Sequence, residues 1–401
     1  MQVALLKDVG KIIRENCMII KQISILKQFQ CTGAACPSNC CRGWKIPIDD
    51  DAYEKYIAEK GVFGFILRCF LVKKEELTSF RHSKHQYRCP FWGFDKLCGL
   101  QKRHGTDYMP LVCVQFPRQL SNFGSFCEET LYLACPEAAR LFIEQARAKI
   151  PFDFEETMGE AAYEENTTND DLDFLHYLLK TRAELIAMLE NGCGLNTVLL
   201  NYAKDAQDKC LAYGTQNTGV NLGSKDFALP SPLDYNISDG KLFTTDANAM
   251  YTLFFKGFYH PSLKHSSPVL YKLCQKYIRT FYTLTKTNPE TADAMLKSLM
   301  ESVYDYVPDF DVLMTYYYEY YLQKNFLDIF EDYCFLKHML CGMAQVRMFQ
   351  LFVTLYCQDL RGRRKRLLST EELSLIMGVY ERRAPQIEDA LKDPKILPLS
   401  Y

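Results

Sequence analysis

The chain has 401 residues, and its 47 lysine and arginine residues nearly balance its 49 aspartate and glutamate residues, leaving a formal charge of −2. Hydrophobic residues make up 48% and charged residues 24%, which is the balance of a globular chain with a sizeable core. The near-neutral charge argues against nucleic acid as a partner, because such affinity comes from a basic excess. A membrane partner is not expected either, because no stretch approaches the roughly 20 apolar residues of a membrane span.

The first part of the chain does not resemble a signal peptide. Charged residues recur every few positions up to Lys27, so that no apolar segment forms. We therefore expect a cytoplasmic protein. The segment that begins at Met18 has the character of a natural start, so we expect residues 1–17 to be a leader from an upstream start and assign them no function. We draw the boundary of the leader region, residues 1–23, at the beginning of the cysteine-rich module.

Residues 24–145 form a cysteine-, glycine- and proline-containing module with short elements. The acidic run Asp49–Asp51 predicts the start of a short helix that continues through Tyr56. Near the end of the module, Pro136-Glu137 predicts the start of a second helix, because apolar residues follow at helical spacing.

Residues 146–401 are expected to form a larger helical body. The acidic stretch from Asp153 to Asp173 predicts an exposed linker, and the stretch 214–245 predicts a hairpin or mobile loop. Apolar periodicity predicts helices over 171–190, 196–213, 247–259, 267–286, 289–306, 309–330, 332–358 and 370–391. The predicted fold class is mainly α: a small cysteine-rich metal-binding module followed by a large helical body, with sheet confined to short pieces of the module and of 214–245.

Cysteines are concentrated in the front module. Of 17 in the chain, ten lie between Cys31 and Cys135. The spacing is Cys31-x4-Cys36-x3-Cys40-Cys41, then Cys89-x8-Cys98 and Cys113. Because no secretory signal is present, thiols are expected to be reduced, and such clusters indicate metal ligation before disulfides.

The spacing alone leaves the metal open, because zinc and iron–sulfur centres both accept four thiolates. The alternatives are buried structural cysteines and a closed zinc site that only folds the module. The Cys-x3-Cys-x2-Cys signature of radical S-adenosylmethionine enzymes is absent. We interpret His82, His85 and His104 as surface residues, and Trp44 and Trp92 as covers that keep the metal site dry.

Four motifs carry a family resemblance. They are FQCTGAACPSNCCRGWKIPIDDDAYEKY (29–56), CPFWGFDKLCGLQ (89–101), CVQFPR (113–118) and ETLYLACPEAARL (129–141). Together they resemble the bacterial flagellin lysine-N-methylase family, and the front module is similar to zinc- or iron-chelating cysteine-cluster domains. The resemblance is strong over residues 24–145 and weaker in the body, where YYYEYYLQKNFLDIF (316–330) is similar to the family's later region.

The resemblance implies methyl transfer from S-adenosylmethionine to lysine side chains of flagellin, with an iron–sulfur cluster held by front cysteines. We predict a 4Fe–4S cluster, with zinc as the second choice. The predicted ligands come from Cys31, Cys36, Cys40, Cys41, Cys89, Cys98 and Cys113. We favour Cys36, Cys40, Cys98 and Cys113, in which Cys41 can replace Cys40, and we expect Cys69 and Cys127 to be spare.

Methylation needs a neutral lysine amine, and a tyrosine hydroxyl or a carboxylate can receive its proton. We name Tyr317 and Tyr320 as candidate catalytic residues, although a tyrosine run at helical spacing is usually core. The residues that bind S-adenosylmethionine stay unassigned, because no glycine-rich turn joins a strand to a helix. Helix capping explains the nearest match, Gly192-Cys193-Gly194.

Two interpretations of function follow. The first is the methyltransferase, for which the basic run Arg361–Arg366 is either a protein-docking patch or a solvated loop before a capping box at Ser369. The second is a non-catalytic metal- or redox-sensing cysteine-cluster protein whose helical body binds a partner. A body of some 250 residues favours the enzyme.

Overall fold

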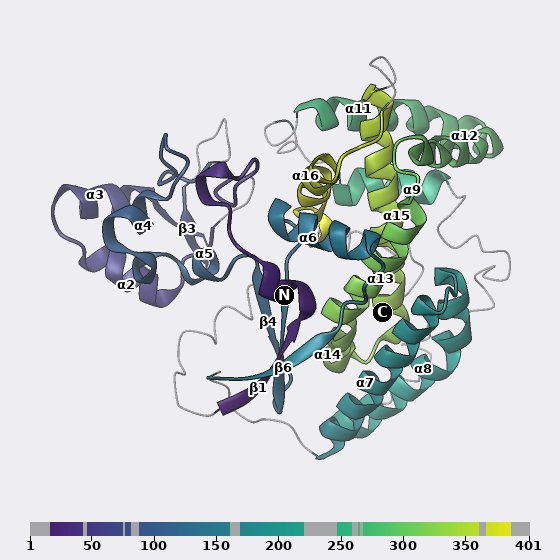
Figure 1. Cartoon of the computed structure of the whole chain (residues 1–401), viewed down its shortest axis with the longest axis horizontal. Helices are drawn as coiled ribbons and strands as arrows, with labels where there is room; N and C mark the ends of the chain where they lie inside the picture. Colours follow the sequence, from purple (N-terminus) through teal and green to yellow (C-terminus); the bar gives the residue numbers. More distant parts are fainter. Residues whose placement is uncertain are drawn as a thin grey trace.

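The computed structural model describes residues 17–42, 46–74, 77–81, 88–160, 169–219, 247–258, 264, 268–360 and 366–385. The described chain is mostly helical, which confirms the mainly α prediction, and it also contains a four-stranded mixed sheet and a two-stranded sheet. Figure 1 shows a small module of short helices on one side, the four-stranded sheet in the middle and a large helical body on the other side.

The small module is built from short elements around a hydrophobic core of its own. They are α2 (Asp50–Ala58), α3 (Gly61–Phe70), β2 (Leu71–Lys74), β3 (Leu77–Phe80), α4 (Gly99–His104) and α5 (Leu111–Gln115). Helix α2 starts as predicted, because the Asp49 carboxylate accepts a hydrogen bond from the Ala52 amide at 3.0 Å. The core residues are Ile46, Ile48, Ala52, Tyr56, Leu67, Phe80, Cys89, Phe91 and Leu100.

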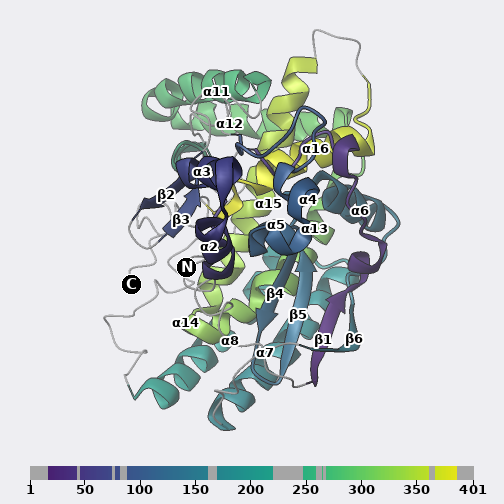
Figure 2. The same cartoon turned by 90° about the vertical axis from the view of Figure 1, so that its left-hand side faces the viewer.

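The four-stranded sheet has the order β4 (Arg118–Asn122), β5 (Phe126–Leu131), β1 (Cys17–Ile23), β6 (Phe154–Glu160). Strand β1 is parallel to β5 and antiparallel to β6, while β4 is antiparallel to β5. Residues 17–23, which we assigned to the leader, thus form an inner strand, and Figure 2 shows the sheet below α4 and α5.

The sheet is more extensive than predicted, because β1 and β6 lie outside residues 24–145. Strand β6 occupies part of the expected linker Asp153–Asp173. Its side chains explain the error. Glu155, Glu156 and Met158 are exposed, so the strand has no apolar face to reveal it, and it is defined by its pairing with β1.

The helices predicted for the body are present over most of their length, but the helix predicted over 309–330 is interrupted at Phe326–Asp328. The helix predicted over 370–391 ends at Glu381, and residues 386–391 lie outside the described residues. The helices are α6 (Pro136–Arg147), α7 (Asn169–Glu190), α8 (Leu195–Thr218), α9 (Ala247–Leu253), α11 (Pro268–Thr287), α12 (Pro289–Glu301), α13 (Phe310–Asn325), α14 (Ile329–Asp332), α15 (Phe335–Leu360) and α16 (Thr370–Glu381). Helix α16 begins in the predicted capping box of Ser369 and Glu372. Most of the stretch 214–245 lies outside the described residues.

Helix α15 is the central helix of the body. By length and composition it passes as a membrane span, but 89% of its apolar window is buried inside the protein. A helix that is buried to this extent is part of the protein core.

The large core also includes the sheet and α6, through Phe126, Leu131 and Phe142. The core of the body therefore includes residues that precede 146. The domain boundary at residue 145 stays a prediction.

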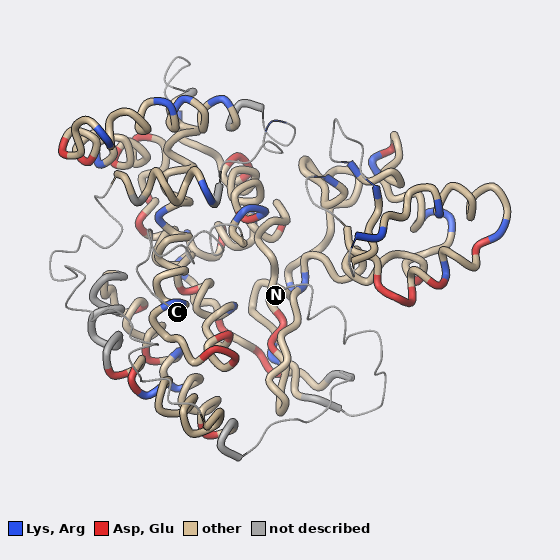
Figure 3. Tube along the Cα trace, turned by 180° about the vertical axis from the view of Figure 1, so that it is seen from behind, with Lys and Arg blue, Asp and Glu red and all other residues tan. Residues whose placement is uncertain are grey.

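Charged residues of both signs are spread over the described chain (Figure 3). The acidic side chains of Asp50, Asp51 and Glu54 are exposed on α2, at the rim of the small module.

Candidate functional site

Four cysteines from separate segments gather in the small module. Cys89 belongs to the core of the module, and Cys41, Cys98 and Cys113 pack against that core. The backbone holds two of them directly, since the Cys89 amide donates to the Cys41 carbonyl at 2.9 Å. Cys98 is fixed by a β-bridge to Trp92, and Cys113 lies on the short helix α5. All four are among the seven candidate ligands, and the fold packs them in or against one small core, but only Cys98 and Cys113 belong to the favoured set.

The thiols of this group influence each other's ionisation. A hydrogen bond from Cys41 lowers the pKa of Cys40 to about 7, and the same bond raises the pKa of Cys41. Burial raises the pKa of Cys89 to about 12, and burial together with the charges of Cys40, Cys89 and Cys98 raises that of Cys113. Ionising several of these buried thiols together is therefore costly without a cation, and soft thiolate donors suit zinc or iron.

Trp92 is the second sign that this site suits a bound group. Its indole Nε1 is buried and has no hydrogen-bond partner among the described residues. The guanidinium of Arg88 lies 4.2 Å from the centre of its ring, and that of Arg42 lies 5.4 Å from it. A buried N–H donor and two cations next to thiols are what a negatively charged sulfur cluster needs around it.

Two of the three remaining predicted ligands, Cys31 and Cys36, lie near a cysteine that the prediction left out. Cys135 precedes α6, and its thiol accepts hydrogen bonds from the Glu137 and Ala138 amides. Burial raises its pKa to about 11, and the nearby charges of Cys36 and Cys31 contribute. The front cysteines thus fall into two groups, and Cys40 belongs with the first, because it is hydrogen-bonded to Cys41 and its charge acts on Cys89 and Cys113. Within the described residues, no three or more Cys, His, Asp or Glu side chains lie close enough together to hold a metal ion.

The two cysteines expected to be spare lie apart from these groups. Cys69 is exposed on α3, and Cys127 is buried in β5 within reach of the Asn122 side chain. Of the other predicted residues, His104 stacks on Tyr108 with ring centres 4.2 Å apart, and Arg366 pairs with Glu372. Trp44, His82, His85 and Arg361–Lys365 lie outside the described residues.

The candidate catalytic tyrosines are in the interior of the body. Tyr317 is 3% exposed and donates a hydrogen bond to the Glu381 carboxylate; burial and Glu381 raise its pKa well above the ordinary value. Tyr320 is 1% exposed, and its hydroxyl donates to the Leu131 carbonyl at 2.5 Å and accepts from the Leu131 amide at 3.1 Å. Both hydroxyls have protein partners, and their catalytic role stays a prediction.

Sequence reasoning did not single out Glu319, a buried acid on the same helix. It is 1% exposed and accepts a hydrogen bond from the Phe152 amide at 2.7 Å. Burial raises its pKa to about 7, with contributions from Glu190 and Asp153, so it exchanges a proton near neutral pH. A charged residue within an apolar helical stretch was the only signal that the sequence offered.

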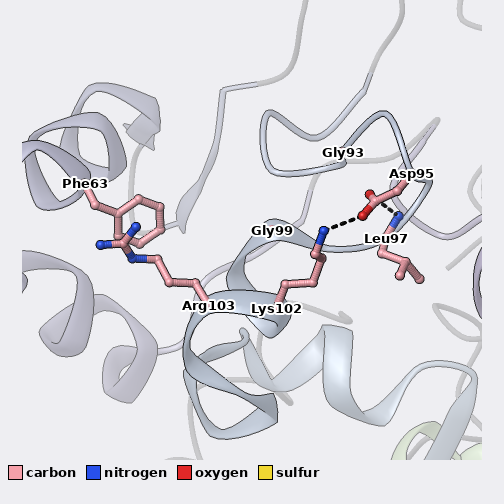
Figure 4. Close-up of a pocket in the computed structure, with 7 residues that line it drawn as sticks. All are labelled: Phe63, Gly93, Asp95, Leu97, Gly99, Lys102 and Arg103. Carbon is pink, nitrogen blue, oxygen red and sulfur yellow. Dashed lines mark hydrogen bonds and ion pairs between the residues drawn. The ribbon is translucent and has the colours of Figure 1, made fainter.

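A shallow cavity of about 380 Å³ opens on the small module between α3 and α4. Figure 4 shows Arg103 over the ring of Phe63, at 4.4 Å, and the ion pair of Lys102 with Asp95. The loop that forms one wall connects Cys89 to Cys98, so that the cavity adjoins the cysteine group but lies apart from the tyrosines of α13.

Comparison with known proteins identifies relatives. The flagellar biosynthetic protein FliU of Salmonella muenchen is 30% identical over 123 residues, which are 29% of this chain and 73% of FliU. The lysine-N-methylases of Salmonella typhimurium and Salmonella choleraesuis are also 30% identical over 123 residues, but the match spans only 31% of their length. No family model and no solved structure matches the chain.

The relatives define the class: a cysteine-rich, mainly helical protein related to flagellar biosynthesis proteins and lysine-N-methylases. The chain belongs to the family of FliU and these lysine-N-methylases, as the cysteine motifs predicted.

Proposed function

We propose that the protein is a cytoplasmic S-adenosylmethionine-dependent methyltransferase that methylates lysine side chains of flagellin. The observation that carries this proposal is the kinship with lysine-N-methylases and with a flagellar biosynthetic protein. Flagellin is the substrate that unites the two names. The match to the lysine-N-methylases covers about a third of their length. Lysine methylation by this chain is therefore a proposal.

The second part of the proposal is a 4Fe–4S cluster held by thiolates of the front cysteines, with zinc as the alternative. The convergence of Cys41, Cys89, Cys98 and Cys113 supports it, together with the buried indole N–H of Trp92. This set differs from the favoured Cys36, Cys40, Cys98 and Cys113 in two members, and Cys41 was already named as a substitute for Cys40. When bound, the group would stabilise the module and supply a redox-sensitive or positioning element.

Methyl transfer is a displacement in which the lone pair of the lysine amine forms the N–CH3 bond. The S–CH3 bond breaks, its electron pair remains on sulfur, and a proton leaves the nitrogen. At neutral pH only about one lysine in a thousand is neutral, and deprotonation costs roughly 4 kcal/mol. Tyr317 and Tyr320 are the residues that we propose for taking up that proton, and burial raises the pKa of the neighbouring Glu319 to about 7, which is the range of a proton acceptor at neutral pH.

The methyl donor requires a setting other than a doubly wound nucleotide fold. In the described sheet, only β1 and β5 are parallel, and no glycine-rich turn leads from a strand into a helix. The residues that bind S-adenosylmethionine therefore stay unassigned.

The experiment is to incubate the protein with flagellin from the same source and S-adenosylmethionine labelled in its methyl group. We expect methyllysine in flagellin only when all three are present, at a rate that rises with pH as lysine loses its proton. The reaction should proceed without a reductant, because a polar displacement needs no electron.

Two results would contradict this proposal in different ways. A requirement for a strong reductant, with release of 5′-deoxyadenosine, would rule out the polar mechanism. A protein that binds metal but never labels flagellin would favour the non-catalytic metal- or redox-sensing alternative.

A further inference from the structure

Arg382 joins the helical body to the cysteine loop of the small module. It follows α16, and its guanidinium donates to three backbone carbonyl groups of the loop. Nη2 lies 3.0 Å from the Ser38 oxygen and 3.4 Å from the Asn39 oxygen, while Nη1 lies 3.4 Å from the Arg42 oxygen. These carbonyls bracket Cys40 and Cys41, so a single side chain fixes the turn that presents both thiols.

The same guanidinium also lies close to the second cysteine group. Helix α16 packs along α6, and a Cβ on Gly378 would lie 3.3 Å from the Ala134 carbonyl, next to Cys135. Burial lowers the pKa of Arg382, and the charges of Cys40, Cys36 and Cys135 oppose that shift. Arg382 is thus a cation close to Cys40 and to two members of the second group, Cys36 and Cys135.

The preceding residue connects this contact to the interior of the body. The Glu381 carboxylate accepts the hydrogen bond of Tyr317, and the Glu381 carbonyl accepts that of the Tyr132 hydroxyl at 2.7 Å. Two adjacent residues at the end of α16 therefore contact the cysteine loop on one side and a candidate catalytic tyrosine on the other.

We propose that Arg382 is a positioning residue that holds the turn Ser38–Arg42 against the body and so keeps Cys40 and Cys41 in register with the rest of the thiol site. The role of this turn as a metal-binding segment rests on the proposed function. The planar guanidinium suits the task, because its several donors reach three carbonyls at once, which a lysine ammonium on a flexible stem does not reproduce.

The test compares Arg382→Gln and Arg382→Lys with the unchanged protein, using Arg147→Gln as the control. Arg147 spans the other end of the α6–α16 pair, where it bonds to Asp309 and Thr370 at 2.8 Å. Two readouts are measured: hydrogen exchange in peptides that cover 36–42, and the alkylation rate of Cys40 after treatment with a chelator. The alkylation rate is compared at a pH high enough to ionise Cys40 in every variant, because the charge of Arg382 also lowers the pKa of this thiol. We expect both to rise about tenfold in Arg382→Gln, with little rescue by lysine, because hydrogen bonds from a charged group are lost.

Neither readout depends on methyl transfer or on a bound metal. If the protein carries no iron, the proposed cofactor fails while the role of Arg382 is still decided by exchange and alkylation. Unchanged exchange and alkylation in Arg382→Gln would overturn the inference. An equal rise in Arg147→Gln would also overturn it, since the effect would then reflect general loss of stability.

Discussion

Glu319 is the residue whose ionisation the fold changes in the most testable way. Its carboxyl group is buried, and this burial raises its pKa from 4.5 to about 7. The unfolded chain therefore releases this proton at lower pH than the folded chain does. Below about pH 4.5 Glu319 is protonated in both the folded and the unfolded chain, so its ionisation does not change the free energy of unfolding. As pH rises toward 7 the folded state loses stability, by roughly 3 kcal/mol at about 1.36 kcal/mol per pKa unit.

Glu319→Gln is expected to remove this pH dependence. Its amide oxygen can still accept the hydrogen bond from the Phe152 amide. Thermal unfolding should show the variant gaining stability over the unchanged protein between pH 5 and pH 8. The exposed Glu144, which pairs with Arg140 on α6, provides the control Glu144→Gln. Parallel stability curves for Glu319→Gln and the unchanged protein would contradict the buried-acid interpretation.

At this scale, the spacing of the cysteines predicted a shared thiol site in the module and named Cys41, Cys89, Cys98 and Cys113 among seven candidates, but the set that it favoured contained only Cys98 and Cys113 of these four. It did not predict that Cys135 joins Cys31 and Cys36. That grouping depends on where α6 begins relative to a loop one hundred residues earlier, and no local pattern encodes such a contact.

Among the elements, the sheet is held to the helices by a buried ion pair. Arg182 of α7 bonds both oxygens of Glu128 on β5, at 2.5 and 2.8 Å, and also the Gln323 carbonyl of α13, at 3.1 Å. Both side chains are less than a tenth exposed. Removing one partner leaves an uncompensated charge in the interior, which costs much more than the pair itself contributes.

Arg182→Ala is therefore expected to destabilise the protein by about 3–5 kcal/mol, measured by denaturant unfolding. Arg140→Ala, which breaks surface pairs on α6, should cost less than about 1 kcal/mol. A double variant, Arg182→Met with Glu128→Gln, should recover part of the loss, because no lone charge remains. Equal losses for Arg182→Ala and Arg140→Ala would show that the buried pair is not important for joining the sheet to the body.

Helices were predictable and strands were not, for a physical reason. The helices of the body carry apolar side chains at helical spacing, and proline, glycine or a capping box marks several of their ends, as at Pro136 and Ser369. Strand β6 has exposed acidic side chains, and β1 pairs with segments more than one hundred residues away. Such pairing is non-local, and periodicity within a short window does not reveal it.

On the scale of the whole molecule, the two hydrophobic cores differ greatly in size. Among the described residues, the core of the small module contains nine buried apolar side chains, while the core of the body, together with the sheet, is several times larger. A core as small as that of the module rarely supplies more than about 3–5 kcal/mol, and small domains usually add a metal or disulfides. Cys41, Cys89, Cys98 and Cys113 lie within or against this small core, so metal binding and folding of the module are expected to be coupled.

The coupling between metal binding and folding of the small module can be tested by removing the metal or its ligands. Protein purified without oxygen should contain iron and sulfide, and removing the metal should lower the stability of the small module while the body stays folded. Cys98→Ser and Cys113→Ser should lose the metal, and their small module should unfold before the body does. Hydrogen exchange in peptides that cover 46–115 measures this early transition. Cys69→Ser, at an exposed position of α3, should keep both metal and stability, and Cys127→Ser should keep the metal.

Colourless protein with one tightly bound zinc and no iron would contradict the iron–sulfur version but retain the coupling. Full stability of the module in Cys98→Ser and Cys113→Ser would contradict the coupling itself, because the small core would then be sufficient without its thiol site.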